Sequence, residues 1–522
     1  MNLQELTKQT IAEAAKLTKG ILAGSIEKAI TTTTGASGIT GYILEAPMQQ
    51  LVPLLSPFRQ TIPRKTQPGA TAVNWKVITS INIGSKFSTA ENFSANGFTY
   101  STSDKTAAFR VVGRLGSVTR EAIAAAQNFD DAKAREVTNT LLQAMKEEEI
   151  AILGANRTAL GTMGTVVVTV RSGLGSLAAA AGGLFVRVVA LTLFGASRHV
   201  VDIPAFYNGT DAFIAGNAHA STAGTWLDVA TDGVAIISAE VNSAAVSLND
   251  ALKITWPAVN NAFAYAVFVS STTNTEKLEA IVTQTSITLQ SLAGTGIAYT
   301  VARNNNGATV TLTGNDTSGD ALIFDGLSPL INADTNAFKK NVNGVLTVTS
   351  STGEVREIND AVTYLYNVWK IDDFRVVCGV TENRNITKGM IAAGGGPTIF
   401  VNAGGGNDRT EITMGYHVAE LVSPTGKKMP VDILPWLPGG TLFILPTRLP
   451  FPMAGVEQPF EIAAGYGWEQ LDYAMTPNQS AAGQQAAVSG TGPVSAFEVR
   501  SWACLKAYFP GGCAILTNIF NG

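Results

Sequence analysis

The 522-residue chain contains few of the residue types from which metal, redox and disulfide-stabilised sites are built. It has three cysteines and three histidines: Cys378, Cys504, Cys513, His199, His219 and His417. Three cysteines are too few for a disulfide framework, their spacing fits no zinc motif, and no two histidines have metal-ligand spacing. Each cysteine lies in an apolar run, which predicts buried free thiols. We expect no metal site and a reducing compartment.

Charge is also scarce, at 15% of residues against the usual ~25%. The 36 basic and 40 acidic residues give a net charge of −4, and no basic stripe is present. This balance argues against a dedicated nucleic-acid-binding protein. No apolar run reaches the ~20 residues of a membrane span, and residues 1–30 are too charged for a signal peptide. We expect a protein made in the cytoplasm that does not enter a membrane.

The sequence motifs of common catalytic sites are either absent or lack the flanking elements that such a site requires. Neither H-E-x-x-H nor G-x-S-x-G occurs. Gly173, Gly175 and Ala178 match G-x-G-x-x-A, but a β-rich run follows where a dinucleotide site needs a helix. Glycine runs at 394–396 and 404–406 lack the G-K-[ST] of a phosphate loop. The acidic run KEEEI (146–150) is interpreted as a solvated or subunit-facing helix face. No catalytic, cofactor-binding or metal-binding residue is nominated, so we expect neither an enzyme nor a cofactor.

The N-terminal third consists of elements that lack a core of their own. Residues 3–30 have a thin apolar helical face, and five prolines in 42–68 predict an extended arm. A long hairpin is predicted over 70–115, with Val73, Trp75 and Val77 on the outward strand and Phe109, Val111 and Leu115 on the returning strand. A long helix is predicted over 130–153 and ends at Gly154. These elements need partner surfaces, which indicates a subunit of an assembly.

Residues 158–320 change to short alternating strands, typical of a β-sandwich. The stretch ITWPAVNNAFAYAVFVSS (254–271), with Trp256 and Tyr265, resembles the second and third strands of a fibronectin type III domain, a likeness that covers about 233–313. Residues 158–230 either form a second sandwich or share strands with the first. Beyond 324 the pattern predicts a helix over 354–370, a strand over 374–380, a hairpin around 423–427 and a β-rich end.

The order of these elements resembles the major capsid protein of tailed double-stranded DNA bacteriophages, the Hong Kong 97-type fold. VDILPWLPGGTLFIL (431–445) is similar to the strand, turn and strand of the axial domain in that family. ACLKAYFPGGCAILTNI (503–519) is similar to its terminal strands, and Phe324–Leu327 to the point where the peripheral domain resumes. The resemblance covers about 1–157 and 321–522.

The resemblance implies an α+β Hong Kong 97-type capsid fold with an inserted all-β sandwich, of immunoglobulin or fibronectin type. The implied parts are 1–69 N-terminal helix and arm, 70–115 extended hairpin loop, 116–157 spine helix of the peripheral domain, 158–320 inserted sandwich, 321–389 remainder of the peripheral domain, and 390–522 axial domain and C-terminal strands. Chain ends that meet near Asn156 and Phe324 would let the insert fold alone and project outward as a decoration.

The function that the resemblance implies is a structural one. Copies would self-assemble into hexamers and pentamers of an icosahedral phage head that encloses double-stranded DNA without reading its sequence. The chain would be assembled in the host bacterial cytoplasm, with scaffold, portal and cement proteins as further partners, and would reside in the virion capsid. In some relatives a lysine and an asparagine join subunits covalently, for which the candidates here are Lys86 and Asn518. Because the chain begins at Met1, we expect no removal of an N-terminal segment and a mature mass near 54.6 kDa.

Three alternatives remain open from the sequence. A tail or portal protein of a phage is the nearest, although tail-tube proteins are shorter and portals have more helix. A surface adhesin with fibronectin-like modules would need a secretion signal. A glycosidase with an accessory sandwich would need paired carboxylates in a pocket, and no pair can be nominated.

Overall fold

The computed structural model describes helices and strands in the ranges 56–82, 91, 99–126, 131–198, 233–292, 294, 298–299, 316–349, 354–392, 418–450, 456, 458–472 and 494–520. The predicted helix over 3–30, the arm up to residue 55, Lys86, all three histidines and both glycine runs lie outside these ranges. The chain divides into two compact units, Met1–Val52 with Arg120–Arg135, and Pro53–Thr119 with Glu136–Gly522. In the first, the described residues are the helix α3 (Arg120–Ala126) and the start of α4 (Ala132–Gly154). The elements below belong to the second unit.

The predicted long helix is present as α4, and its 23 residues make it about 35 Å long. Its last residue is the glycine that the sequence suggested as a stop. A Cβ at Gly154 would lie 2.8 Å from Cβ of Leu193 and 2.8 Å from the ring of Phe263. A glycine stands at this position because neighbouring segments approach its backbone too closely for a side chain.

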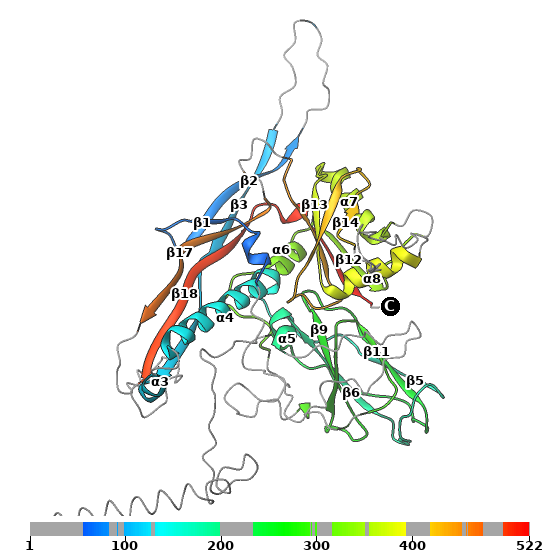
Figure 1. Cartoon of the computed structure of the whole chain (residues 1–522). Coiled ribbons are helices and arrows are strands. Elements are labelled where there is room, and N and C mark those ends of the chain that lie inside the picture. The colour runs from blue at the N-terminus through cyan, green and yellow to red at the C-terminus, as the bar shows by residue number, and fades with distance from the viewer. Residues whose placement is uncertain are drawn as a thin grey trace, which may run out of the picture. The chain divides into compact units, whose positions relative to one another are not determined.

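A four-stranded sheet packs along α4 in the order β1 (Arg64–Thr66), β17 (Phe460–Asp472), β18 (Val494–Ala507) and β4 (Arg110–Thr119) (Figure 1). The approach is close, because a Cβ at Gly116 of β4 would lie 2.8 Å from Oγ1 of Thr140 on the helix. The short strand β1 pairs with β17 in parallel, so the end of the N-terminal arm becomes part of this sheet. A 3₁₀ helix, η2 (Phe58–Gln60), precedes β1.

The long hairpin is present, but its returning strand differs from the prediction. Strand β2 (Ala72–Asn82) pairs antiparallel with β3 (Thr99–Ala108), which ends just before the residues predicted for the returning strand. Phe109, Val111 and Leu115 instead precede or lie in β4, which pairs with β18. The alternation over 109–115 does mark a strand, but the strand that pairs with it comes from the C-terminal end of the chain. Periodicity shows that a segment is a strand and does not show which strand lies beside it.

A mixed six-stranded sheet forms the second half of the fold, flanked by three helices, α6 (Leu327–Ala333), α7 (Arg356–Trp369) and α8 (Val380–Ala392). Its order is β12 (Phe338–Gly344), β19 (Ala514–Ile519), β16 (Leu442–Pro446), β13 (Phe374–Cys378), β15 (Lys428–Ile433) and β14 (Glu420–Val422). The predicted helix over 354–370 is α7, whose Ile358, Val362 and Leu365 are buried as expected. The hairpin predicted around 423–427 joins β14 to β15. The strands of VDILPWLPGGTLFIL lie on either side of β13 and do not pair with each other.

Between α4 and α6 lies a region of two sheets, here called the two-sheet region. One sheet has the order β10 (Lys277–Val282), β9 (Ala264–Ser270), β6 (Phe185–Leu191) and β7 (Val241–Asn242). The other has the order β11 (Ser286–Leu289), β8 (Ala251–Thr255) and β5 (Val167–Arg171). Strands β5 and β6 pair with β8 and β9, so the described residues before 199 share sheets with those after 250.

The two sheets enclose an apolar cluster that contains Trp256 and Tyr265, whose ring centroids are 5.5 Å apart. The hydroxyl oxygen of Tyr265 also accepts a hydrogen bond from the backbone amide of Val259, in the turn before it, at 3.0 Å. These are the two aromatic residues that carried the fibronectin-like resemblance, and both are buried.

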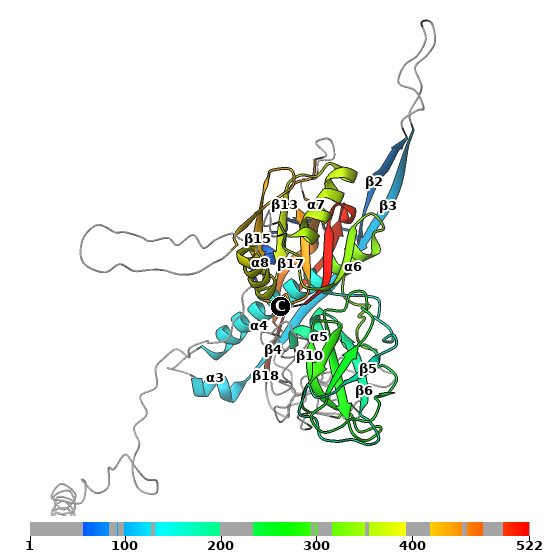
Figure 2. The same cartoon turned by 90° about the vertical axis from the view of Figure 1, so that its right-hand side faces the viewer.

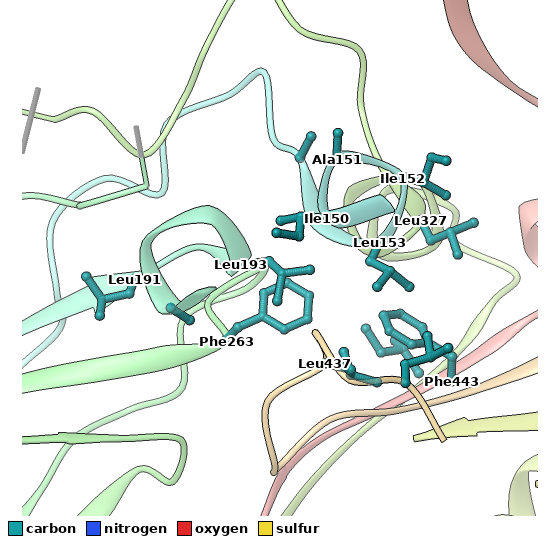
Figure 3. Packing of buried hydrophobic residues seen from close by; sticks show 14 of the residues in the cluster. Ile150, Ala151, Ile152, Leu153, Leu191, Leu193, Phe263, Leu327, Leu437 and Phe443 are labelled. Atoms are coloured by element: carbon teal, nitrogen blue, oxygen red, sulfur yellow. The ribbon is translucent and has the colours of Figure 1, made fainter. Parts of the chain in front are cut away.

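The sheet that contains β9 is buried on its other face as well. Leu191, Leu193 and Phe263 join one apolar cluster with Ile150 and Leu153 of α4 (Figure 3). The same cluster contains Leu327, Leu437 and Phe443 from the following elements. The short helix α5 (Leu193–Arg198) lies beside β6 and β9 at this junction (Figure 2). On this face the region shares an apolar cluster with its host.

The chain leaves and returns to the host at neighbouring points. The amide of Asp320 donates to the carbonyl of Asn156 at 3.0 Å, and the amide of Gly326 donates to the carbonyl of Ala155 at 2.8 Å. The Arg157 amide donates to Oδ1 of Asp325 at 2.9 Å. These bonds close the two-sheet region at its base.

Candidate functional site: the spine-helix hub and the hairpin root

Four consecutive residues of α4, Lys146 to Glu149, contact four different parts of the chain; we call them the spine-helix hub. Successive residues of an α-helix point about 100° apart, so a run of four covers most of its circumference. On a solvated helix such a run would face water. Here Glu148 is 3% and Glu149 0% exposed, so the interpretation of this run as a solvated or subunit-facing surface is wrong.

Glu148 binds two arginines of the arm. Its carboxylate accepts a hydrogen bond from Nε of Arg59 at 2.8 Å and two from the guanidinium of Arg64 at 2.8 and 2.9 Å. The indole Nε1–H of Trp468, on β17, donates to the same carboxylate at 3.2 Å. A carboxylate taken out of water needs such partners, and bidentate arginine pairing is the strongest kind available. This ion-pair group fixes η2 and β1 against the helix.

Glu149 binds the backbone of the arm. Its Oε2 accepts the amide N–H of Phe58 at 2.8 Å and that of Arg59 at 3.2 Å, which are donors at the start of η2. Burial raises the pKa of Glu149 to about 7, although the two N–H donors and the nearby Arg59 act in the opposite direction. The other carboxyl oxygen, Oε1, is buried without a partner in the described part of the chain.

The remaining two hub residues reach other elements. Glu147 forms a bidentate pair with Arg114 of β4, at 2.5 Å for each contact, and also accepts from Gln143 at 3.0 Å. The ammonium of Lys146 lies 3.9 Å from the ring centroid of Trp436, in the loop between β15 and β16, a cation–π geometry. Burial lowers the pKa of Lys146. The hub thus ties the arm, β4, β17 and this loop to one turn of helix.

The raised pKa of Glu149 predicts a pH dependence of stability. Released from burial, the carboxyl titrates near 4.5, while in the folded chain it titrates near 7. The folded state then binds more protons between these values, so the free energy of unfolding falls as pH rises from 4.5 to 7, by about 3 kcal/mol at most. We expect Glu149→Gln to remove this part of the slope. Chemical unfolding of both proteins at pH 5 and pH 8 measures it, and equal slopes would contradict the assignment.

The hairpin is anchored at its root by an aromatic and charged cluster. The Trp75 ring of β2 makes an edge contact with Tyr508 at 6.1 Å between centroids. The ammonium of Lys506 lies 5.2 Å from the Trp75 centroid and donates to the Tyr508 hydroxyl at 2.7 Å. Tyr508 in turn donates to Glu461, which also pairs with Lys65 at 2.8 Å. Cation–π and aromatic contacts of this kind hold the base of β2 to the sheet of β17 and β18.

Beyond its root the hairpin has no covering partner among the described residues. Ile78 is 61% and Tyr100 60% exposed. The charged pair between the root and Ile78, Lys76 with Asp104 at 3.5 Å, is exposed on both sides. Two strands alone have marginal stability in water, and large apolar side chains stand exposed on these two.

The described structure places several residues and motifs that the sequence singled out. All three cysteines are free and buried, as predicted, and burial raises the pKa of Cys378 to about 12 and of Cys504 to about 11. No group of three His, Cys, Asp or Glu residues that could hold a metal occurs within the described ranges. Strand β6, not a helix, follows the G-x-G-x-x-A match. Among the described helices, none is long and apolar enough to cross a membrane.

The two residues considered for a covalent link are placed differently. Lys86 lies outside the described residues. Asn518, in β19, is 5% exposed, and its side-chain amide donates to Oδ1 of Asn341 at 3.1 Å. Sequence reasoning did not select the arm arginines Arg59 and Arg64. The sequence did contain a signal for this pairing: two basic residues stand among the prolines of the arm, and an acidic run stands on the long helix.

Comparisons with known proteins give distant likenesses only. No protein-family model and no curated protein matches the chain. Among solved structures, the capsid of a native GTA particle matches with 9% identity and a TM-score of 0.38, covering 96% of this chain and 100% of that chain. The capsid of the cyanophage P-SCSP1u matches with 7% identity and a TM-score of 0.36, covering 95% and 98%. The holo-SrpI encapsulin complex from Synechococcus elongatus PCC 7942 matches with 8% identity and a TM-score of 0.36, covering 92% of each chain. These TM-scores are below 0.5, so the proposal below rests on the residues of this chain.

Proposed function

We propose that this chain is a structural subunit of a closed protein shell, of the tailed-phage major capsid type. The observation that carries the proposal is the hairpin of β2 and β3. It is firmly rooted through Trp75, yet Ile78 and Tyr100 beyond the root are uncovered. A rigid base with an uncovered apolar ribbon suits an element that lies on a neighbouring copy and extends the contact between subunits.

The spine-helix hub supports the same role. It uses charged side chains, most of them buried, to fix the arm, β4 and β17 on one helix. A subunit that shares load with many neighbours needs such internal rigidity, because each contact between copies is small and only their sum closes the shell.

The finer features of the proposal follow the resemblance in the sequence. Copies form hexamers and pentamers of an icosahedral head that encloses double-stranded DNA, with scaffold, portal and cement proteins as partners. The head is assembled in the host cytoplasm, and the chain acts without an enzymatic site or cofactor. The two-sheet region is the proposed immunoglobulin- or fibronectin-like insert. A covalent link would require Asn518 to leave its bond with Asn341, and monomer bands alone on a denaturing gel of intact particles would exclude that link.

The hairpin provides the test of the proposal. We expect the double variant Ile78→Asp, Tyr100→Asp to fold with unchanged circular dichroism and melting temperature, because both side chains are already exposed. It should lose assembly, measured by light scattering and sedimentation, because charge in a covered contact is costly. Val167→Asp on β5, where the side chain is 53% exposed, is the matched control and should assemble. Assembly of the double variant at the level of the unmodified chain would contradict the proposal.

A further inference from the structure

Two exposed leucines lie on adjacent loops at one end of the two-sheet region. Leu174 is 59% exposed in the loop after β5, and Leu248 is 67% exposed in the loop before β8. We call the segments 172–183 and 242–249, which carry them, the leucine tip. Single exposed leucines are common on protein surfaces, but two on neighbouring loops need an explanation.

The backbone beneath these leucines is tightly held. The buried carboxylate of Asp250 accepts the amide of Gly173 at 3.1 Å and that of Ser247 at 2.8 Å, so it ties one loop to the other. The Gly175 amide donates to the carbonyl of Asn249 at 3.0 Å. A Cβ at Gly175 would lie 2.3 Å from the carbonyl oxygen of Asp250, so the backbones touch and only glycine fits. The leucines are therefore presented on a fixed scaffold, which lowers the entropy cost of binding through them.

The two segments contain no ionisable side chain, while the exposed Arg171 precedes one and the buried Asp250 follows the other. The segments read SGLGSLAAAAGG and NSAAVSLN, in a chain whose residues are 15% charged. Alanine, glycine and serine surround the leucines and leave them accessible from above. The leucines and the small residues around them offer no charge to a basic or acidic partner, and a second copy of the same surface would bring no like charges against them. Around a twofold axis each residue meets its own copy or one close to it, and any charge would face a like charge.

From these observations we propose that the leucine tip is a contact between two copies of this chain, related by a local twofold axis. The tip lies at the start of β6, while the end of β6 reaches α5 and the apolar cluster at α4 (Figure 1). Seven strand residues place these ends about 20 Å apart. The tip can thus join copies without disturbing the packing of the two-sheet region on its host. This contact is separate from the hairpin and does not depend on the shell proposal.

Cysteine cross-linking of the full-length chain tests the contact. A cysteine near a twofold axis meets its own copy, so Leu248→Cys should form a disulfide-linked dimer under mild oxidation, seen on a non-reducing gel. Thr169→Cys, on the exposed face of β5, is the matched control and should give several-fold less dimer. The three native cysteines are buried and protonated, so they add little background. Equal dimer from both variants, or none from Leu248→Cys, would overturn the proposal.

A second variant separates this contact from the hairpin contact. Leu174→Asp with Leu248→Asp places two charges from each copy at the axis, and the fold should be unaffected because both side chains are exposed. We expect the cross-link of a nearby Ser247→Cys to be lost in this background. Cross-linking that persists there would also overturn the proposal. Cross-links at the tip in a protein that forms no shell would refute the shell proposal and support the tip contact. Shells whose subunits do not cross-link at the tip would support the shell proposal and refute the tip contact.

Discussion

A chain that lacks residues 158–320 is expected not to fold, although the ends of this region lie close together. Removal would strip Leu191, Leu193 and Phe263 from the cluster around Ile150 and Leu153 and expose that end of α4 to water. Large apolar side chains removed from such a cluster cost about 2–5 kcal/mol each, which together exceeds much of the stability of an ordinary domain. The two-sheet region acts as part of the host core and not only as a decoration on it.

A point substitution measures the same effect in the full chain. Phe263→Ala should lower the free energy of unfolding by about 3–5 kcal/mol, because the ring is 3% exposed and packs beside Gly154. Leu174→Ala, at an exposed leucine of the same region, is the control and should change stability by less than ~0.5 kcal/mol. Hydrogen exchange should show amides of β9 and β16 becoming less protected together in Phe263→Ala. A soluble, folded deletion protein with a normal melting temperature would contradict this account.

Glu148→Gln is the substitution with the second large expected effect. The amide keeps the shape of the side chain but leaves Arg59 and Arg64 without their shared charge, at a site where the carboxylate is 1% exposed. Loss of one partner of a buried ion pair typically costs about 3–5 kcal/mol. We expect the arm to open from the helix more often, although Glu149, the buried Phe58 ring and the pairing of β1 with β17 still hold it.

Limited trypsin digestion reports that release directly. The bonds after Arg59 and Arg64 should be cut early in Glu148→Gln and late in the unmodified chain, with the products identified by mass. Glu147→Gln on the same turn is the control. Its pair with Arg114 is 22% and 42% exposed, so its loss should cost about 1 kcal/mol or less and leave the arm protected. Equal digestion of all three proteins would show that Glu148 does not hold the arm.

The elements that could be predicted from the sequence are those with strong local patterns. Periodicity predicted the helices α4 and α7, and turn residues predicted the β14–β15 turn. The buried stripe of α7 consists of Ile358, Val362 and Leu365. Strand β10 departs from a simple apolar pattern, because Glu279 lies in it and Glu276 directly before it. Both glutamates are buried, Glu276 against Arg187 and Glu279 against the amide of Gly294.

What could not be predicted concerns partners far apart in the chain. The pattern over 109–115 shows a strand but not that β18 lies beside it, and it therefore misplaced the returning strand of the hairpin. The run at 146–149 shows charge on a helix but not that the arm, β4 and β17 surround it. Composition and spacing describe each segment by itself, whereas burial of a charge depends on which segments meet in the fold.

The central claim is that copies of this chain build a closed shell, and electron microscopy of the purified full-length protein tests it most directly. Negative-stain images, with mass by light scattering, should show icosahedral shells or rings of five and six copies, either alone or after co-expression with the products of neighbouring genes. Well-folded monomers under both conditions would contradict the claim.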